Sequence, residues 1–136
     1  MTLFSEMTAI QAAALYVGLL AMVMLGLKLY VGNRRGTLKV PPGDVSNTEF
    51  GRASRVQMNA VEDVPILAVG IVVLALLGMP VWYLHMTGAV LVISRIAHAT
   101  GLASSAGFSL GRTVGTLGTL LVYLAVAGAL VVHAFV

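Results

Sequence analysis

The sequence predicts an all-α integral membrane protein, a bundle of four transmembrane helices in a single domain covering residues 1–136. Of the 136 residues, 59% are hydrophobic and 10% are charged, whereas a soluble domain is about 45–50% apolar and roughly 25% charged. A chain this short has too little interior to hide that much apolar surface from water. The apolar residues also fall into four segments, each near the length of about 20 residues that a membrane-spanning helix needs.

The first predicted span covers about residues 8–31 and contains a single charge, Lys28, which lies near its end and can reach the interface. A loop is predicted for about residues 32–49, because Pro41-Pro42-Gly43 interrupts any regular structure there. Thr48 or Ser46 is predicted to cap the helix that follows.

The second predicted span covers about residues 50–77, with a polar first half and an uninterrupted apolar second half. A tight turn at Gly78-Met79-Pro80 leads to the third span, about residues 81–101, where Trp82 and Tyr83 are placed as interfacial anchors. A loop of small and polar residues, about 102–109, precedes the fourth span at about 110–135.

Glycines form a stripe along the fourth span at Gly111, Gly115 and Gly118. Such a stripe allows another helix to approach closely. Ordinary membrane-helix glycines explain it equally well.

The basic residues predict the orientation of the chain in the membrane. Five of the eight Lys and Arg residues lie between Arg34 and Arg55, and Arg112 follows the third span. Positive charge favours the cytoplasmic side, so the loops 32–49 and 102–109 are predicted to be cytoplasmic and both termini outside. The net charge of +3 is then explained by orientation and anionic lipid head groups rather than by nucleic acid.

Composition also limits the chemistry. Cysteine is absent, so no disulfide, thiolate nucleophile or iron–sulfur site of the chain's own is predicted. The three histidines are scattered without the spacing of metal ligands. The sequence therefore predicts no metal site.

Polar side chains cluster at one end of the predicted bundle. Arg52, Arg55, Asn59 and Glu62 follow one another at helical spacing and share one helix face. Arg95 and His98 lie one turn apart on the third span, and Arg112 begins the fourth. Charged groups at membrane depth are costly and persist where they pair or bind something.

Two interpretations of this cluster stay open. Arginine forks bind carboxylates and a carboxylate receives an ammonium, so the cluster suits a small anionic or zwitterionic ligand. The structural alternative is that Arg95 pairs with Glu62 or Asp63 to neutralise buried charge, and that the loop arginines only set the topology.

The stretch Arg55-Val-Gln-Met-Asn-Ala-Val-Glu-Asp-Val-Pro65 resembles the second-helix signature of the MAPEG family, the membrane-associated proteins in eicosanoid and glutathione metabolism. That signature reads approximately Arg-x-x-x-Asn-x-x-Glu-x-x-Pro. The paired arginine Arg34-Arg35 and the stretch Ser94-Arg95-Ile96-Ala97-His98 are also similar to that family. The resemblance covers nearly the whole chain and points to a bacterial member similar to microsomal glutathione transferases, in the inner membrane.

The resemblance implies a homotrimer that binds glutathione as co-substrate between neighbouring subunits, near the cytoplasmic side. By position, the expected glutathione-binding residues are Arg34, Arg55, Gln57, Asn59, Glu62 and His98. Arg112 is the expected catalytic residue beside the thiol, while Arg95 and Asp63 are expected to form a structural ion pair. A guanidinium favours the thiolate, the form of the thiol that attacks electrophiles. The implied function is a glutathione S-transferase or peroxidase acting on hydrophobic electrophiles that enter from the lipid.

The chain departs from that family at two positions. Eicosanoid-synthesising members carry tyrosines where this sequence has Leu102 and Thr116. Glutathione binding is therefore better supported than catalysis, and a leukotriene or prostaglandin substrate is not supported. A non-enzymatic lipid-binding or scaffold protein of the same fold stays open. A small multidrug or ion transporter is a remote alternative, because no carboxylate lies within the first span.

Overall fold

The computed structural model describes residues 6–44, 46–105 and 107–136, and in those residues it contains four α-helices and no β-strand. The helices are α1 (Ala9–Thr37), α2 (Thr48–Leu76), α3 (Val81–Ser104) and α4 (Leu110–His133). All four are long and apolar enough to cross a membrane. The predicted all-α bundle of four transmembrane helices is confirmed.

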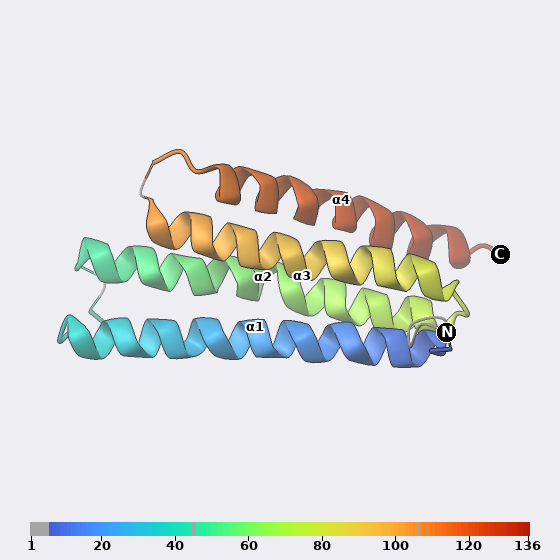
Figure 1. Ribbon diagram of the computed structural model, residues 1–136, viewed down its shortest axis with the longest axis horizontal. Coiled ribbons are helices and arrows are strands. Elements are labelled where there is room, and N and C mark those ends of the chain that lie inside the picture. Colours follow the sequence, from blue (N-terminus) through green and yellow to red (C-terminus); the bar gives the residue numbers. More distant parts are fainter. Residues whose placement is uncertain (1–5, 45, 106) are drawn as a thin grey trace.

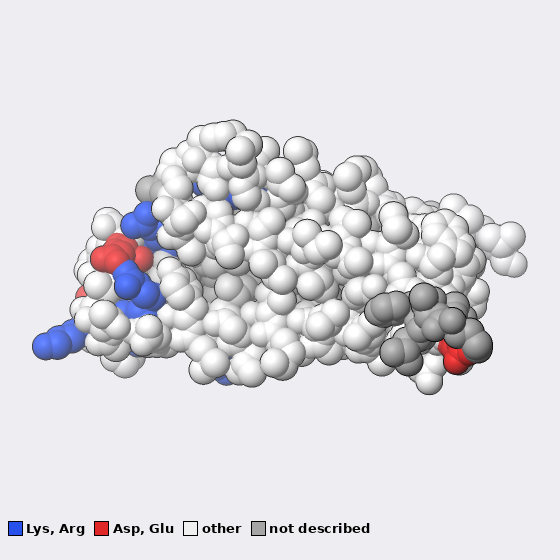
Figure 2. All heavy atoms as spheres, viewed as in Figure 1, with Lys and Arg blue, Asp and Glu red and all other residues white. Residues whose placement is uncertain are grey.

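The helices run antiparallel to their neighbours in sequence (Figure 1). The α1–α2 and α3–α4 connections lie at one end of the bundle, and the α2–α3 turn and the C-terminus lie at the other. Helices α2 and α3 pack against each other and against both outer helices, whereas the described residues of α1 and α4 do not touch. Most of the charged side chains visible in Figure 2 gather at the end that carries the two longer connections, which is called the charged end below.

The cap of α2 differs from the prediction, which placed Thr48 or Ser46 there. Asn47 is the capping residue, because its Oδ1 accepts a hydrogen bond from the backbone N–H of Phe50 at 2.9 Å. The Ser46 hydroxyl is engaged elsewhere, donating to Asp44 Oδ1 at 2.7 Å. Thr48 is the first residue of the helix itself.

Helix α1 also continues beyond its predicted end at residue 31, through Arg34 and Arg35 to Thr37. The predicted loop at 32–49 is correspondingly shorter. Basic side chains in the last turn of a helix interact favourably with its dipole, and the Thr37 hydroxyl donates to the carbonyl of Asn33 within that turn. Helix α3 likewise runs past residue 101 to Ser104.

The α2–α3 turn forms where predicted. Gly78 has a φ of +80°, a left-handed conformation that glycine adopts without steric cost. The N–H of Met79 then reaches back to the carbonyl of Leu74 at 3.0 Å and closes the helix end. A turn this tight brings α3 directly back along α2.

The apolar core lies along the centre of the bundle, and α4 reaches it through its glycines. The largest fully buried side chains come from the first three helices: Leu20, Val56, Leu67, Ile71, Leu74, Leu84 and Leu91. A Cβ built on Gly115 would lie 2.5 Å from the carbonyl oxygen of Ser94 and 2.6 Å from the backbone nitrogen of His98. Gly111 and Gly118 also face α3, so the glycine stripe is the contact surface between α3 and α4.

We expect Gly115→Ala to lower the free energy of unfolding by about 1–3 kcal/mol, the usual cost of overpacking. The added methyl group meets backbone atoms of α3, which cannot rotate away as a side chain would. The measurement is reversible unfolding in mixed detergent micelles. Gly128→Ala is the matched control on the same helix, because a Cβ there meets nothing within 4 Å. Equal effects of the two substitutions would contradict the close α3–α4 contact.

Candidate functional site

A single buried guanidinium connects three helices. Arg95 of α3 is 2% exposed, and its Nη1 donates to Asp63 Oδ2 of α2 at 2.8 Å and to Asn59 Oδ1 at 3.0 Å. Its Nη2 donates to Thr119 Oγ1 of α4 at 2.5 Å and to the carbonyl of Gly115 at 3.3 Å. The ion pair expected between Arg95 and Asp63 is therefore present in the structure. Because α3 extends to Ser104, Arg95 lies more than two turns inside the helix, deeper than the sequence indicated.

The structure also distinguishes the two carboxylates of α2. Asp63 pairs with Arg95 and accepts a further hydrogen bond at Oδ1 from the Tyr123 hydroxyl of α4, at 3.2 Å. Glu62 is exposed. Hydrogen bonds and ion pairs are stronger in a low-dielectric interior than in water. Asp63 thus compensates the buried charge of Arg95, and Glu62 is left at the surface of the chain.

The surface of α2 carries three of the expected ligand-binding residues. Arg55 and Glu62 are exposed, and Asn59 lies half-buried between them. Their spacing of four and three residues places them along one helix face, which is called the α2 polar face below. Gln57 follows Arg55 by two positions and therefore points to the opposite side of the helix. One chain alone does not bring Gln57 together with the other three.

His98 and Arg112 both lie near the contact between α3 and α4. His98 is 6% exposed, and its backbone and Cβ lie against Gly115. Arg112 is exposed on the first turn of α4, and its backbone nitrogen contacts Gly101. The His98 imidazole lies within electrostatic reach of Arg95, Asp63 and Arg112. His98 therefore lies beneath the surface at which Arg112 is exposed.

Arg34 is engaged at the charged end by a different partner. Its guanidinium forms a salt bridge with Glu49 in the first turn of α2. The neighbouring Arg35 stacks 4.4 Å above the Phe50 ring and donates to the carbonyl of Pro41 at 3.0 Å. Through these contacts, Arg34 and Arg35 connect the end of α1 to the start of α2.

Sequence reasoning missed Thr119 and Tyr123 of α4. Thr119 is one of three threonines that recur at every third position of α4, and neither Thr119 nor Tyr123 belongs to a recognisable motif. Their spacing of four residues places them on one side of α4. This spacing was the only signal in the sequence, and the structure shows that this side of α4 faces Arg95 and Asp63.

Leu102 and Thr116 occupy the positions at which the eicosanoid-synthesising members of the similar family carry tyrosines. Leu102 packs against the apolar core, and the Thr116 hydroxyl donates to the carbonyl of Arg112 at 2.9 Å. Within residues 6–44, 46–105 and 107–136, no group of three or more His, Asp or Glu side chains is arranged to hold a metal ion.

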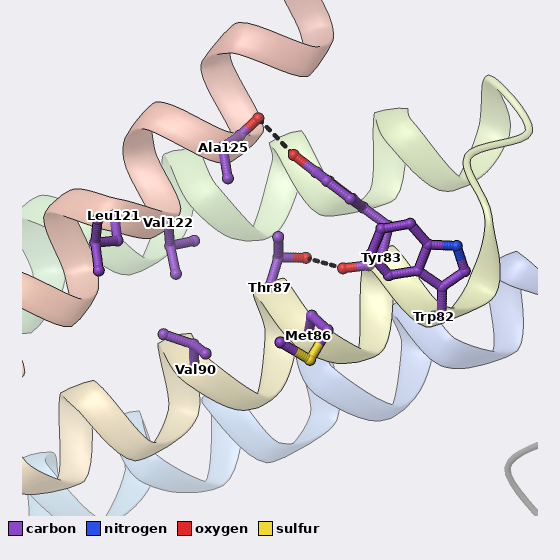
Figure 3. A pocket seen from close by; sticks show the side chains of 8 residues that line it. All are labelled: Trp82, Tyr83, Met86, Thr87, Val90, Leu121, Val122 and Ala125. Atoms are coloured by element: carbon purple, nitrogen blue, oxygen red, sulfur yellow. Dashed lines mark hydrogen bonds between the residues drawn. The ribbon is translucent and has the colours of Figure 1, made fainter.

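A polar cavity of about 160 Å³ opens between α2 and α4 beside Arg95. Its lining consists of Asn59, Asp63, Arg95, Thr116, Thr119, Leu120 and Tyr123. A second, apolar groove of about 240 Å³ lies between α3 and α4 nearer the other end of the bundle (Figure 3). Its lining includes Trp82, Met86 and Leu121.

Comparison with known proteins relates most of the chain to one family of membrane proteins. Residues 13–132 match the MAPEG family. The chain is 33% identical over 89 residues to the inner membrane protein YecN of Escherichia coli K12. The aligned residues cover 65% of this chain and 68% of YecN. YecN of E. coli O6:H1 gives the same identity and coverage.

Proposed function

We propose, from the premise that this chain belongs to the MAPEG family, that it binds glutathione at the α2 polar face and uses it as a co-substrate. It is a multi-pass integral membrane protein. The proposed reaction is that of a glutathione S-transferase or peroxidase acting on hydrophobic electrophiles. Its proposed location is a bacterial inner membrane, with the charged end in the cytoplasm.

The observation that carries this proposal is the exposure of Arg55 and Glu62 on α2 and of Arg112 on α4, in a chain in which only 10% of the residues are charged. Exposed charges on a membrane domain are retained where they bind or pair. Glutathione has two carboxylates and one ammonium. Arg55 suits a carboxylate through its bidentate fork, and Glu62 suits the ammonium. Asn59, between them, has an amide that can bind a peptide group of the ligand.

Arg112 provides the chemistry in this proposal. A thiol with a pKa near 8.5 is mostly protonated at neutral pH, and a neighbouring guanidinium favours the thiolate. The thiol proton leaves to water, and the sulfur then forms a bond to an electrophilic carbon. The electrons of the broken bond leave with the departing group or move onto the rest of the substrate. The protein contributes positioning and charge stabilisation.

The site is proposed to be completed by neighbouring subunits of a homotrimer. The charged side chains of the α2 polar face are exposed in the single chain, and lipid would leave them without partners. Gln57 lies on the opposite side of α2 from Arg55, and Arg34 is paired with Glu49, so a second copy would be needed to bring such groups into the same site.

The test is glutathione-dependent consumption of a panel of hydrophobic electrophiles by the purified protein in detergent. We expect turnover that Arg112→Ala reduces by about 100-fold, on the scale of losing one positioned charge at the reacting atom. Lys28→Ala is the control, since it also removes one exposed cation of the chain. If Arg112→Ala kept the wild-type rate, the role assigned to Arg112 would be wrong.

A second candidate is a lipid-binding or scaffold protein of the same family that performs no chemistry. The replacement of the family tyrosines by Leu102 and Thr116 favours it, because neither side chain provides a phenol. This candidate predicts that glutathione binds but that no electrophile of the panel is consumed. The turnover measurement therefore separates the two candidates.

A further inference from the structure

Two apolar grooves lie on the side of the bundle where α1 packs against α3. The first has a volume of about 160 Å³ and is lined by Leu27, Tyr30, Val56, Ala99, Thr100 and Ala103. Because α3 ends at Ser104, this groove lies at the charged end, and it is called the charged-end groove below. The second groove, of about 470 Å³, is lined by Tyr16, Trp82, His85, Met86 and Ala89. It lies where α3 begins, at the opposite end of the bundle.

The charged-end groove has an apolar lining. The hydroxyl of Thr100 donates to backbone carbonyls, those of Ile96 at 2.9 Å and Ala97 at 3.1 Å. Leu27 and Val56 belong to the apolar core, and the other lining residues are half-buried or exposed at the surface of the bundle. A groove of this kind on a membrane domain suits an apolar chain, and the acyl chains of lipids are the apolar chains that the bilayer provides.

Arg34 lies beyond this groove at the charged end. It follows Tyr30 by four residues and Leu27 by seven, a spacing that places all three on one side of α1. The Arg34 side chain is 28% exposed although it forms an ion pair with Glu49. Partly exposed ion pairs are weak, so this guanidinium can also bind an anion at the surface.

Arg52 adds a second guanidinium next to this pair. It lies one turn from Val56 and one turn from Glu49 along α2, and it is half-buried. In the described ranges 6–44, 46–105 and 107–136, Arg52 forms no ion pair. Residues 34–55 include five basic and only two acidic side chains. The charge beside the groove is therefore positive.

The groove lies at a level of the bundle that suits a lipid head group. Tyrosine is enriched at the membrane–water interface, and Tyr30 lines the groove one turn before Arg34. The groove at the opposite end also has interfacial aromatic residues, Tyr16 and Trp82. Neither the α2–α3 turn nor the sequence outside the helices at either terminus contains Lys or Arg. Of these two grooves, only the charged-end groove combines an apolar lining with adjacent positive charge.

We propose that the charged-end groove binds an anionic phospholipid, with an acyl chain between α1 and α3 and the phosphate beside Arg34 and Arg52. Guanidinium groups bind phosphate through paired N–H donors. Basic pockets between transmembrane helices bind anionic head groups in the same way. The lipid is held by contacts alone, and the inference does not depend on the proposed glutathione chemistry.

The test is a titration of the purified protein in detergent with dioleoyl-phosphatidylglycerol and with dioleoyl-phosphatidylcholine, with bound lipid measured by native mass spectrometry. The two lipids have the same acyl chains and differ in net charge. Arg52→Gln removes one guanidinium, and Ala103→Phe fills the groove. Ala89→Phe is the matched control, because Ala89 is also a half-buried alanine of α3 but lines the groove at the opposite end. Arg34 is left unchanged, because it is also an expected glutathione-binding residue.

We expect the wild-type protein to bind phosphatidylglycerol about tenfold or more tightly than phosphatidylcholine. Arg52→Gln should weaken phosphatidylglycerol binding by about fivefold and change phosphatidylcholine binding by less than about twofold. Ala103→Phe should weaken the binding of both lipids by about fivefold, because it removes apolar surface from contact with the chain. Ala89→Phe should leave the affinity for phosphatidylglycerol within about twofold of wild type.

Two results would overturn this inference. Equal affinity of the wild-type protein for the two lipids would show that the arginines do not select an anionic head group. Equal effects of Ala103→Phe and Ala89→Phe on phosphatidylglycerol binding would show that the charged end attracts the lipid without the groove. Because no glutathione is present in these titrations, neither result bears on the proposed function.

Discussion

Asp63→Ala is expected to lower the free energy of unfolding by about 3–5 kcal/mol, because it leaves the buried guanidinium of Arg95 without a compensating charge. Arg95 is 2% exposed and lies between α2 and α4. The remaining side-chain partners of Arg95, Asn59 and Thr119, are uncharged. The measurement is reversible unfolding in mixed detergent micelles, followed by the loss of helical signal.

Two controls separate this effect from the loss of a charge in general. Glu49→Ala breaks the partly exposed ion pair with Arg34 and should cost only about 0–1 kcal/mol, the range of surface pairs. The double variant Asp63→Ala with Arg95→Met removes both buried charges, so it should be more stable than Asp63→Ala alone. If the double variant were as unstable as Asp63→Ala, the ion pair with Arg95 would not explain how Asp63 stabilises the protein.

Arg55→Ala and Glu62→Ala are each expected to weaken glutathione binding by roughly 10- to 100-fold. A hydrogen bond to a charged group contributes about 1.5–3 kcal/mol, and each 1.4 kcal/mol is tenfold in affinity. Both side chains are exposed on the α2 polar face, so their removal should leave the unfolding free energy nearly unchanged. Calorimetric titration with glutathione measures the affinity.

Two further substitutions serve as controls for the loss of glutathione affinity. Lys28→Ala removes an exposed cation from α1 and should leave the affinity within about twofold of wild type. Glu62→Gln keeps the size of the side chain and removes its charge, so it tests the contact with the ammonium group. Unchanged affinity in both Arg55→Ala and Glu62→Ala would place the ligand elsewhere on the molecule.

The four spans could be predicted because apolar segments of sufficient length leave few structural alternatives in a chain with so few charges. The ends of the helices were harder to predict. Asn33-Arg34-Arg35 has the composition of a loop, yet α1 continues through it to Thr37. Helix propensity and the helix dipole favour arginine in a last turn. Asn47 was passed over as the α2 cap because three neighbouring polar residues compete for that role, and the Ser46 hydroxyl is bound to Asp44.

The candidate site was likewise only partly predictable from the sequence. Helical spacing was enough to place Arg55, Asn59 and Glu62 on one face and to pair Arg95 with a carboxylate of α2. Spacing within one helix did not show what α4 contributes, because Thr119 and Tyr123 reach the network only through the packing of α4 against α2 and α3. The orientation in the membrane and the contacts between subunits depend on surroundings outside the chain, so both stay predictions.

Calorimetric titration with glutathione, combined with ultraviolet difference absorption of the thiolate, measures both the binding and the activation of the thiol. We expect glutathione to bind to the purified protein, a thiolate signal to appear on binding, and Arg112→Ala to reduce the signal more than the binding. Binding without thiolate would favour the non-enzymatic candidate. No binding at millimolar glutathione would contradict the proposed function and leave the α2 polar face as a structural feature of the bundle.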